Sequence, residues 1–363
     1  MTQFSIKYPI ASLLLCLSCQ LSIGQNAPKY SNEFLAIGVG ARALGMSGSV
    51  VASTNDVTSG YWNPAGLVLG KGDLQIGLMH ADYFAGIAKY DYGSIAAPID
   101  ATRTAGVSVI RFAIDDIIDS TDLIDADGNI NYDRLKSFSA ADYAFLFSYA
   151  MNAPKIEGLR YGANVKIIHR KVGDFASAWG FGIDAGVQYQ KGNWGFGAVG
   201  KDITSTFNAW RFNTEKLEDV FAETGNEIPE NGMELTLPRL ILGASYKFKI
   251  GEKFTLLPEA NLDLTFDGKR NVLVYADPVS VDPHMGLEAG YRDFIFIRGG
   301  LGNIQQFEDF DGNDGWKMQP NFGVGLKIKN VSIDYALTNI GASGESLYSN
   351  IFSLRFALFK RAK

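Results

Sequence analysis

The sequence predicts an all-β fold: a closed antiparallel transmembrane β-barrel of about 14 strands, preceded by a short helical plug segment. Three observations predict it. Apolar and polar residues alternate over most of the chain, the alternating segments are long, and short links between them alternate with long ones. A closed barrel leaves no strand edge unpaired in lipid, so these features fit a membrane wall.

Alternation is clearest between residues 179 and 190. Every second place there is apolar: Trp179, Phe181, Ile183, Ala185, Val187 and Tyr189. The places between hold glycine or polar residues such as Asp184 and Gln188, so a strand would have one wholly apolar face. Most such segments run about 8 to 12 residues, and a tilted strand needs about 9 to 11 to cross hydrocarbon. Soluble strands are shorter, which disfavours a sandwich or propeller.

The links between the segments alternate in length from Leu74 onward. Short links include 98–102, 152–158 and 191–193, and the long links are 113–140, 202–238, 267–283, 302–319 and 339–350. Outer-membrane barrels have short periplasmic turns and long extracellular loops. We therefore assign residues 74–363 to the barrel, with both termini on the periplasmic side.

Residues 1–24 have the pattern of a signal peptide. Lys7 precedes an apolar run from Ile10 to Leu21, and cleavage is expected before Gln25. A lipoprotein signal acylated at Cys19 is the alternative. Cys16 and Cys19 are the chain's two cysteines, so the exported chain would lack disulfides, zinc thiolates and cysteine nucleophiles. Export and the strand pattern together predict the outer membrane.

Composition excludes several classes of function. The formal net charge is −6, which gives no electrostatic reason to expect nucleic acid. The chain is rich in glycine and aromatic residues, with 40 Gly, 24 Phe and 16 Tyr, as a lipid-facing wall requires. His80, His169 and His284 have no metal-ligand spacing, and no G-x-S-x-G elbow is present. We predict no enzymatic activity and no cofactor.

The segment 25–73 does not alternate and is predicted to be a plug. Ala41 to Ala52 reads as a short helix of small residues, and the four residues after Trp62 read as a turn. Small residues could pack closely against lumen glycines such as Gly162 and Gly186. A periplasmic tail against the barrel rim is the alternative.

This segment also carries the most distinctive motif of the chain. Its residues are Gly40, Arg42, Gly45, Asn55, Asp56, Trp62, Asn63, Pro64 and Gly66. The motif resembles the signature of the PorV/PorQ family, which is similar to the FadL group of fatty-acid transporters. The resemblance implies a fourteen-stranded outer-membrane barrel associated with the type IX secretion system of the Bacteroidetes. PorV-like members bind the C-terminal signal domain of secreted cargo and carry it to an attachment complex.

Two other motifs are weaker. Residues 38–43 imitate a dinucleotide fingerprint, but no βαβ unit follows. Asp309, Asp311 and Asn313 form a weak calcium candidate, since alternate acidic oxygens suit a hard cation. The glycine stands at the wrong offset and Pro320 takes the place of the closing acid, so a solvated acidic loop is the preferred interpretation.

These features of the sequence point to two functions. The first is a non-enzymatic barrel of the type IX pathway, whose loops bind cargo or secretion-system partners. Its tentative anchors are loop aromatics: Phe207, Trp210, Phe212, Phe307, Phe310 and Trp316. The alternative is a FadL-like transporter of hydrophobic small molecules. A lumen face with charged residues such as Lys166, Asp184 and Arg239 disfavours it, because unpaired ions beside an apolar ligand are costly.

Overall fold

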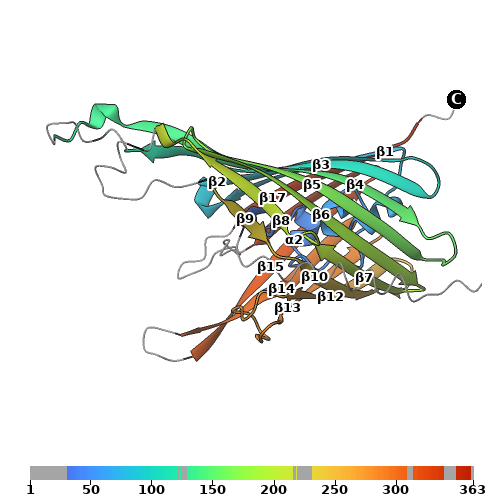
Figure 1. Ribbon diagram of the computed structural model, residues 1–363. Helices are drawn as coiled ribbons and strands as arrows, with labels where there is room; N and C mark the ends of the chain where they lie inside the picture. The colour runs from blue at the N-terminus through green and yellow to red at the C-terminus, as the bar shows by residue number, and fades with distance from the viewer. Residues whose placement is uncertain are drawn as a thin grey trace, which may run out of the picture.

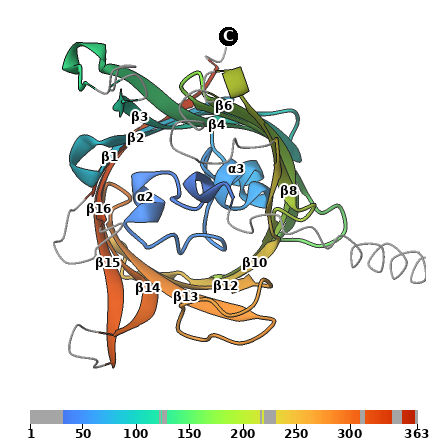
Figure 2. The same ribbon diagram turned by 60° about the vertical axis from the view of Figure 1, so that its left-hand side comes forward.

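The computed structural model describes residues 31–120, 123, 129–215, 218, 231–308, 314–338 and 349–360, so the expected signal peptide lies outside it. One antiparallel sheet forms a closed barrel, because β1 pairs with both β2 and β17. Figures 1 and 2 show the tilted strands of this cylinder. The strands are β1 (Leu74–Tyr83), β2 (Ala88–Pro98), β3 (Arg103–Asp119), β4 (Lys136–Asn152), β5 (Leu159–Val172), β6 (Ala176–Lys191), β7 (Trp194–Lys201), β8 (Thr206–Phe212), β9 (Met233–Thr236), β10 (Arg239–Tyr246), β11 (Phe248–Ile250), β12 (Phe254–Thr265), β13 (Ser280–Tyr291), β14 (Ile295–Glu308), β15 (Asp314–Ile328), β16 (Val331–Thr338) and β17 (Ser349–Leu358).

Three of these strands, β8, β9 and β11, continue another strand and do not add a position around the barrel. β7 and β8 pair with successive parts of β6, so β8 continues β7. β9 pairs with β8 and β10 pairs with β7, so β9 and β10 share the next position. β10 and β11 both pair with β12. The seventeen strands of the sheet therefore occupy fourteen positions around the barrel. The predicted closed antiparallel barrel of fourteen strands is confirmed.

The wall is apolar outside and polar inside. On β6, Phe181 is 40% exposed and Val187 37%, whereas Asp184 is 2% exposed and Gln188 1%. The predicted orientation of this alternating strand is thus confirmed: the apolar side chains face outward. The buried polar ones face the lumen.

Aromatic side chains gather on the outer surface of the barrel, at the rim that carries the short turns. Trp194 and Tyr246 have ring centroids 4.8 Å apart, Tyr246 and Phe248 4.5 Å, and Phe254 and Tyr291 5.0 Å. Such belts lie at the membrane–water interface. Because short turns are periplasmic in outer-membrane barrels, we call this rim periplasmic and the other extracellular.

Parts of the predicted long links form strands. β3 and β4 remain paired out to Asp119 and Lys136, and β14 and β15 out to Glu308 and Asp314. These two-stranded extensions project beyond the cylinder (Figure 1). The predicted link 202–238 likewise contains β8 and β9. The predicted loop boundaries come too early, because pairing continues after the apolar alternation of the wall ends.

Residues 31–73 lie inside the barrel, where Figure 2 shows α2 and α3 within the ring of strands. The segment contains η2 (Glu33–Leu35), α2 (Ala41–Leu44), α3 (Ser59–Trp62) and η3 (Pro64–Leu69); η4 (Phe84–Gly86) and η5 (Tyr132–Arg134) lie in links. The predicted helix over 41–52 is wrong beyond Leu44. Ser47 has a φ of 53° and Gly48 one of 73°, so the backbone leaves the right-handed helical region there. No helix of the described residues is long and apolar enough to cross a membrane.

Candidate functional site

The plug, residues 31–73, contacts the wall at positions where the wall has no side chain. A β-carbon at Gly162 would overlap the backbone of Pro64 and Ala65. A β-carbon at Gly197 would overlap the carbonyl of Val51. Glycine is required at such sites because the two backbones approach closely. The glycines of the wall therefore form sockets for the plug.

Side-chain amides satisfy the polar backbone of the plug. Asn63 Nδ2 donates to the carbonyls of Val51 and Val187, both at 3.0 Å. Gln188 on β6 donates to the carbonyls of Val51 and Thr54 at 3.1 and 3.0 Å. A buried carbonyl without a partner is costly. These bonds fix the plug in one arrangement within the lumen.

A chain of buried ion pairs begins on the plug at Arg42. Arg42 Nε donates to Glu288 Oε2 on β13 at 2.9 Å. Arg298 on β14 donates to the same oxygen at 2.7 Å. The Arg42 and Glu288 side chains are 14% and 12% exposed, and that of Arg298 is 2% exposed. One carboxylate thus joins the plug to two neighbouring strands.

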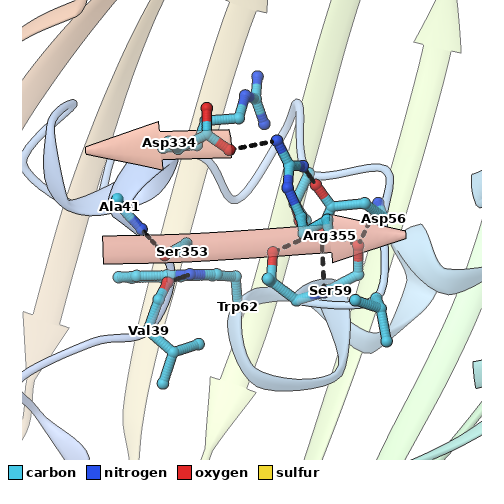
Figure 3. A network of polar contacts seen from close by, with 12 residues as sticks. Val39, Ala41, Asp56, Ser59, Trp62, Asp334, Ser353 and Arg355 are labelled. Atoms are coloured by element: carbon cyan, nitrogen blue, oxygen red, sulfur yellow. Dashed lines mark hydrogen bonds and ion pairs between the residues drawn. The ribbon is translucent and has the colours of Figure 1, made fainter. Parts of the chain in front are cut away.

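The same chain of ion pairs returns to the plug at Asp56. Arg298 Nη1 donates to Asp334 Oδ1 on β16 at 2.7 Å, and Arg355 on β17 donates to Asp334 Oδ2 at 2.8 Å. Arg355 also forms an ion pair with Asp56. Figure 3 shows Arg355 between Asp334 and Asp56, close to the contact in which Ala41 N donates to Ser353. The alternating chain of charges has both ends on the plug, so the wall holds it at two points.

Tyr61 and Trp62 form the aromatic part of the plug's extracellular surface. Their rings meet edge to face, with centroids 4.9 Å apart. Trp62 Nε1 donates to the carbonyl of Val39 at 2.8 Å, and the Tyr61 hydroxyl donates to that of Leu35. Burial raises the pKa of Tyr61 well above its usual value, so the hydroxyl keeps its proton. Lys201 Nζ lies 3.9 Å from the centroid of the Tyr61 ring.

Most residues of the motif in the plug sequence lie in this plug–wall contact. Gly40 has a φ of 84° and donates its backbone N–H to Met79 Sδ, 2.9 Å away. A β-carbon at Gly45 would lie 3.0 Å from the Gly323 backbone, and one at Gly66 would overlap the carbonyl of Thr54. Asn55 differs, because it is exposed in the periplasmic opening. The seating of the plug thus explains the motif apart from Asn55.

Two cavities lie on either side of the plug. The extracellular vestibule has a volume of about 730 Å³, and its lining includes Trp62, Lys201 and Asn321. The periplasmic vestibule measures about 500 Å³ and is lined in part by Arg42 and Arg355. The ion-pair chain therefore borders the periplasmic vestibule.

A second cluster of ion pairs lies beside the break between β7 and β8. Lys166 Nζ lies 2.8 Å from Asp184 Oδ1 and also pairs with Asp202, to which Thr206 donates at 2.6 Å. Asp202 has a positive φ of 55°, which marks the point where the strand bends. Of the lumen charges singled out in the sequence, Lys166 and Asp184 are therefore paired with each other, and Arg239 lies 3.9 Å from Asp263.

Sequence reasoning missed three members of the ion-pair chain: Glu288, Arg298 and Asp334. Each occupies an inward place on its strand, so the alternation could have indicated its direction. The alternation could not have indicated the partner of each residue, because the pairing depends on the register between strands and on the course of the plug, whose Arg42 is 246 residues from Glu288. The predicted lumen residues Lys166, Asp184 and Arg239 do face the interior.

Five of the six predicted partner-binding aromatics lie on strands and not in loops. Phe207, Trp210 and Phe212 are on β8, Phe307 is on β14 and Trp316 is on β15. The loop placement is wrong because these strands stay paired beyond the wall, as described above. Phe307 is 46% exposed and Trp316 53%. Phe310 and the calcium candidates Asp309, Asp311 and Asn313 lie outside the described residues, within which no group of three acidic, histidine or cysteine residues could hold a metal.

No known family matches the sequence, and no curated protein matches it. Solved structures do match the fold. The CymD monoaromatic hydrocarbon channel is 14% identical with a TM-score of 0.54, and the match covers 90% of this chain and 99% of that one. The toluene transporter TbuX of Ralstonia pickettii is 14% identical (TM-score 0.52; 88% and 98% covered). A Pseudomonas aeruginosa FadL homologue is 12% identical (TM-score 0.53; 87% and 97% covered). The chain therefore has the fold of the FadL-like outer-membrane barrels.

Proposed function

We propose that the protein is a FadL-like, non-enzymatic outer-membrane channel for small apolar molecules. The observation on which this proposal rests is that a folded plug divides the lumen into two vestibules of about 730 and 500 Å³. Similar structures are named as hydrocarbon channels or toluene transporters, which supports this class of ligand. In this proposal a ligand enters the extracellular vestibule and passes to the periplasmic one when the plug shifts.

The apolar part of the extracellular vestibule supports an apolar ligand. Its wall and floor include Ile37, Leu44, Val51, Trp62 and Ile241. The charged lumen residues that disfavoured such a ligand have partners: Lys166 lies 2.8 Å from Asp184, and Arg239 lies 3.9 Å from Asp263. Paired ions do not carry the penalty of an unpaired ion beside an apolar molecule.

Uptake by cells tests the channel, because the lipopolysaccharide leaflet of an outer membrane slows apolar molecules that cross a phospholipid bilayer freely. We expect cells with the full chain in their outer membrane to take up a monoaromatic hydrocarbon several-fold faster than cells without it. Asn321→Trp, which narrows the extracellular vestibule, should reduce the gain, because Asn321 lines this cavity. The matched control is Phe322→Trp, one residue along β15, where the side chain is 59% exposed on the outer wall. Uptake equal to that of cells without the protein would refute the channel.

Partner binding in the type IX pathway is the second candidate. The observation that favours it is the exposure of Phe207, Phe307 and Trp316, at 38%, 46% and 53%, on strands that extend toward the extracellular side. Exposed aromatics are common anchors of protein interfaces. Affinity purification of the native protein should then recover a secretion component or cargo signal domain. A variant with these three residues changed to Ser should lose it, and equal recovery by both would contradict this role.

A further inference from the structure

The outer face of β1–β3 carries a row of ionisable side chains. His80 Nδ1 lies 2.7 Å from Asp91 Oδ1, and Arg111 Nη1 donates to Asp91 Oδ2 at 3.2 Å. The three residues occupy neighbouring strands at paired positions, His80 opposite Asp91 and Asp91 opposite Arg111. Their side chains are 51%, 40% and 33% exposed. The row is therefore part of the outer surface and not of the lumen.

This row lies at a height where the rest of the wall is apolar. His80 is six residues, and Asp91 seven, from the periplasmic ends of their strands. At about 2.5 Å of height per residue of tilted strand, the row is about 15 to 20 Å above that rim, within an apolar band about 25 Å tall. Outward residues at the same distance on other strands are Phe145 on β4, Met285 on β13 and Phe322 on β15. Hydrocarbon is a costly neighbour for charged groups, which in membranes usually face protein or water.

A hollow of about 500 Å³ adjoins the charged row. Its lining includes Leu78, Gly93, Val109 and Leu354. Gly93 forms its open floor, because the nearest atom to a β-carbon built there is Leu78 Cδ2, 4.0 Å away. Val109 stands directly opposite Gly93 on the next strand and is 36% exposed. The patch thus has a hollow at Gly93 beside the projecting side chain of Val109, and an acid, Asp91, beside a base, Arg111.

We propose that this patch is the contact face of a homodimer whose two-fold axis passes between β2 and β3, roughly along the membrane normal. A two-fold axis there places β2 of one copy against β3 of the other. Asp91 then faces Arg111 of the second copy, and Val109 enters the hollow over Gly93 of the second copy. An isologous interface needs such a self-complementary patch. A lipid acyl chain could fill the hollow but would leave the ionic row against hydrocarbon.

Cysteine cross-linking in membranes tests the dimer. The chain has no cysteine beyond Cys19, so a single added cysteine beyond that point reports one position of the wall. Val109→Cys should cross-link to twice the chain mass with a reagent that spans about 10 Å, the spacing of two facing sheets. The matched control is Met285→Cys on the opposite side of the barrel, which is outward, at the same height and 56% exposed. It should remain monomeric under the same treatment.

A charge exchange separates the interface from general damage to the barrel. In the Val109→Cys background, Asp91→Arg places two cations opposite each other and should reduce the cross-linked fraction about tenfold. Adding Arg111→Asp restores an acid–base pair and should restore the cross-link. Heat-modifiable migration on gels shows that each variant is folded. These readouts do not depend on whether the barrel conducts small molecules.

Three results would overturn the homodimer. The first is equal cross-linking of Val109→Cys and Met285→Cys, which would indicate random collision. The second is a monomeric mass for the native protein released from membranes, with or without bound lipid. The third is a cross-link from Val109→Cys to a protein of another mass, which would assign the patch to a different membrane partner.

Discussion

At the scale of single residues, the missing side chain at Gly162 determines how closely the plug can approach β5. We expect Gly162→Ala to lower the free energy of unfolding by about 1–3 kcal/mol, because its β-carbon would overlap Pro64 and Ala65. Urea titration of the folded protein in detergent measures the change. Gly299→Ala on β14 is the control, since a β-carbon there meets nothing within 4 Å and should cost about 0.5 kcal/mol or less. Equal losses would mean that glycine content, and not the socket, determines stability.

Asp334 is the residue on which two buried guanidinium groups converge. Asp334→Leu leaves Arg298 and Arg355 short of one acceptor each, so we expect a loss of about 3–5 kcal/mol in unfolding free energy. The control is Asp293→Asn, which removes an ion pair to Lys327 from a side chain that is 70% exposed and keeps a residue type that tolerates the φ of 53° there. Its cost should stay within about 1 kcal/mol, because water screens exposed pairs. A small loss for both variants would remove the ion-pair chain as a determinant of stability.

At the scale of elements, the plug is a set of short helices and turns that depends on the wall. Its longest helix, η3, has six residues, which is too short to be stable alone. Deletion of residues 33–69 should leave a folded barrel with its two vestibules joined. We expect a steady ion conductance in planar bilayers several-fold above that of the full chain. Unchanged conductance would mean that other segments close the lumen.

The elements differ in how far the sequence predicts them. The wall strands are predictable because lipid on one side and water or plug on the other impose a two-residue period. β8 and β9 were not predicted as strands. The backbone bends at Asp202, and Pro238 interrupts the strand that follows β8, so the sequence of this region resembles that of a loop. The paired extensions of β3–β4 and β14–β15 lie beyond the wall, where no lipid imposes alternation.

At the scale of the whole molecule, barrel closure and strand number follow from the sequence, but the seating of the plug does not. An inward polar residue such as Glu288 can be placed on the lumen face from its position in the strand. Its partners, Arg42 and Arg298, depend on the three-dimensional course of the plug and on the register between strands. The motif indicates the right segment, while the ion pairs that hold the segment arise only when the barrel closes around it.

The placement of the whole barrel in the bilayer can be measured through its tryptophans. Trp179 is 57% exposed and Trp194 50% on the outer wall, whereas Trp62 in the plug is 8% exposed. In variants that keep one tryptophan each, with the others changed to Phe, lipids brominated on their acyl chains should quench Trp179 and Trp194 strongly. Trp62 should be quenched little, because the wall separates it from lipid. Bromine close to the headgroup should quench Trp194 more than bromine at the chain end, since Trp194 belongs to the aromatic belt of the periplasmic rim. Quenching of Trp62 as strong as that of Trp194 would contradict an apolar outer wall around an enclosed plug.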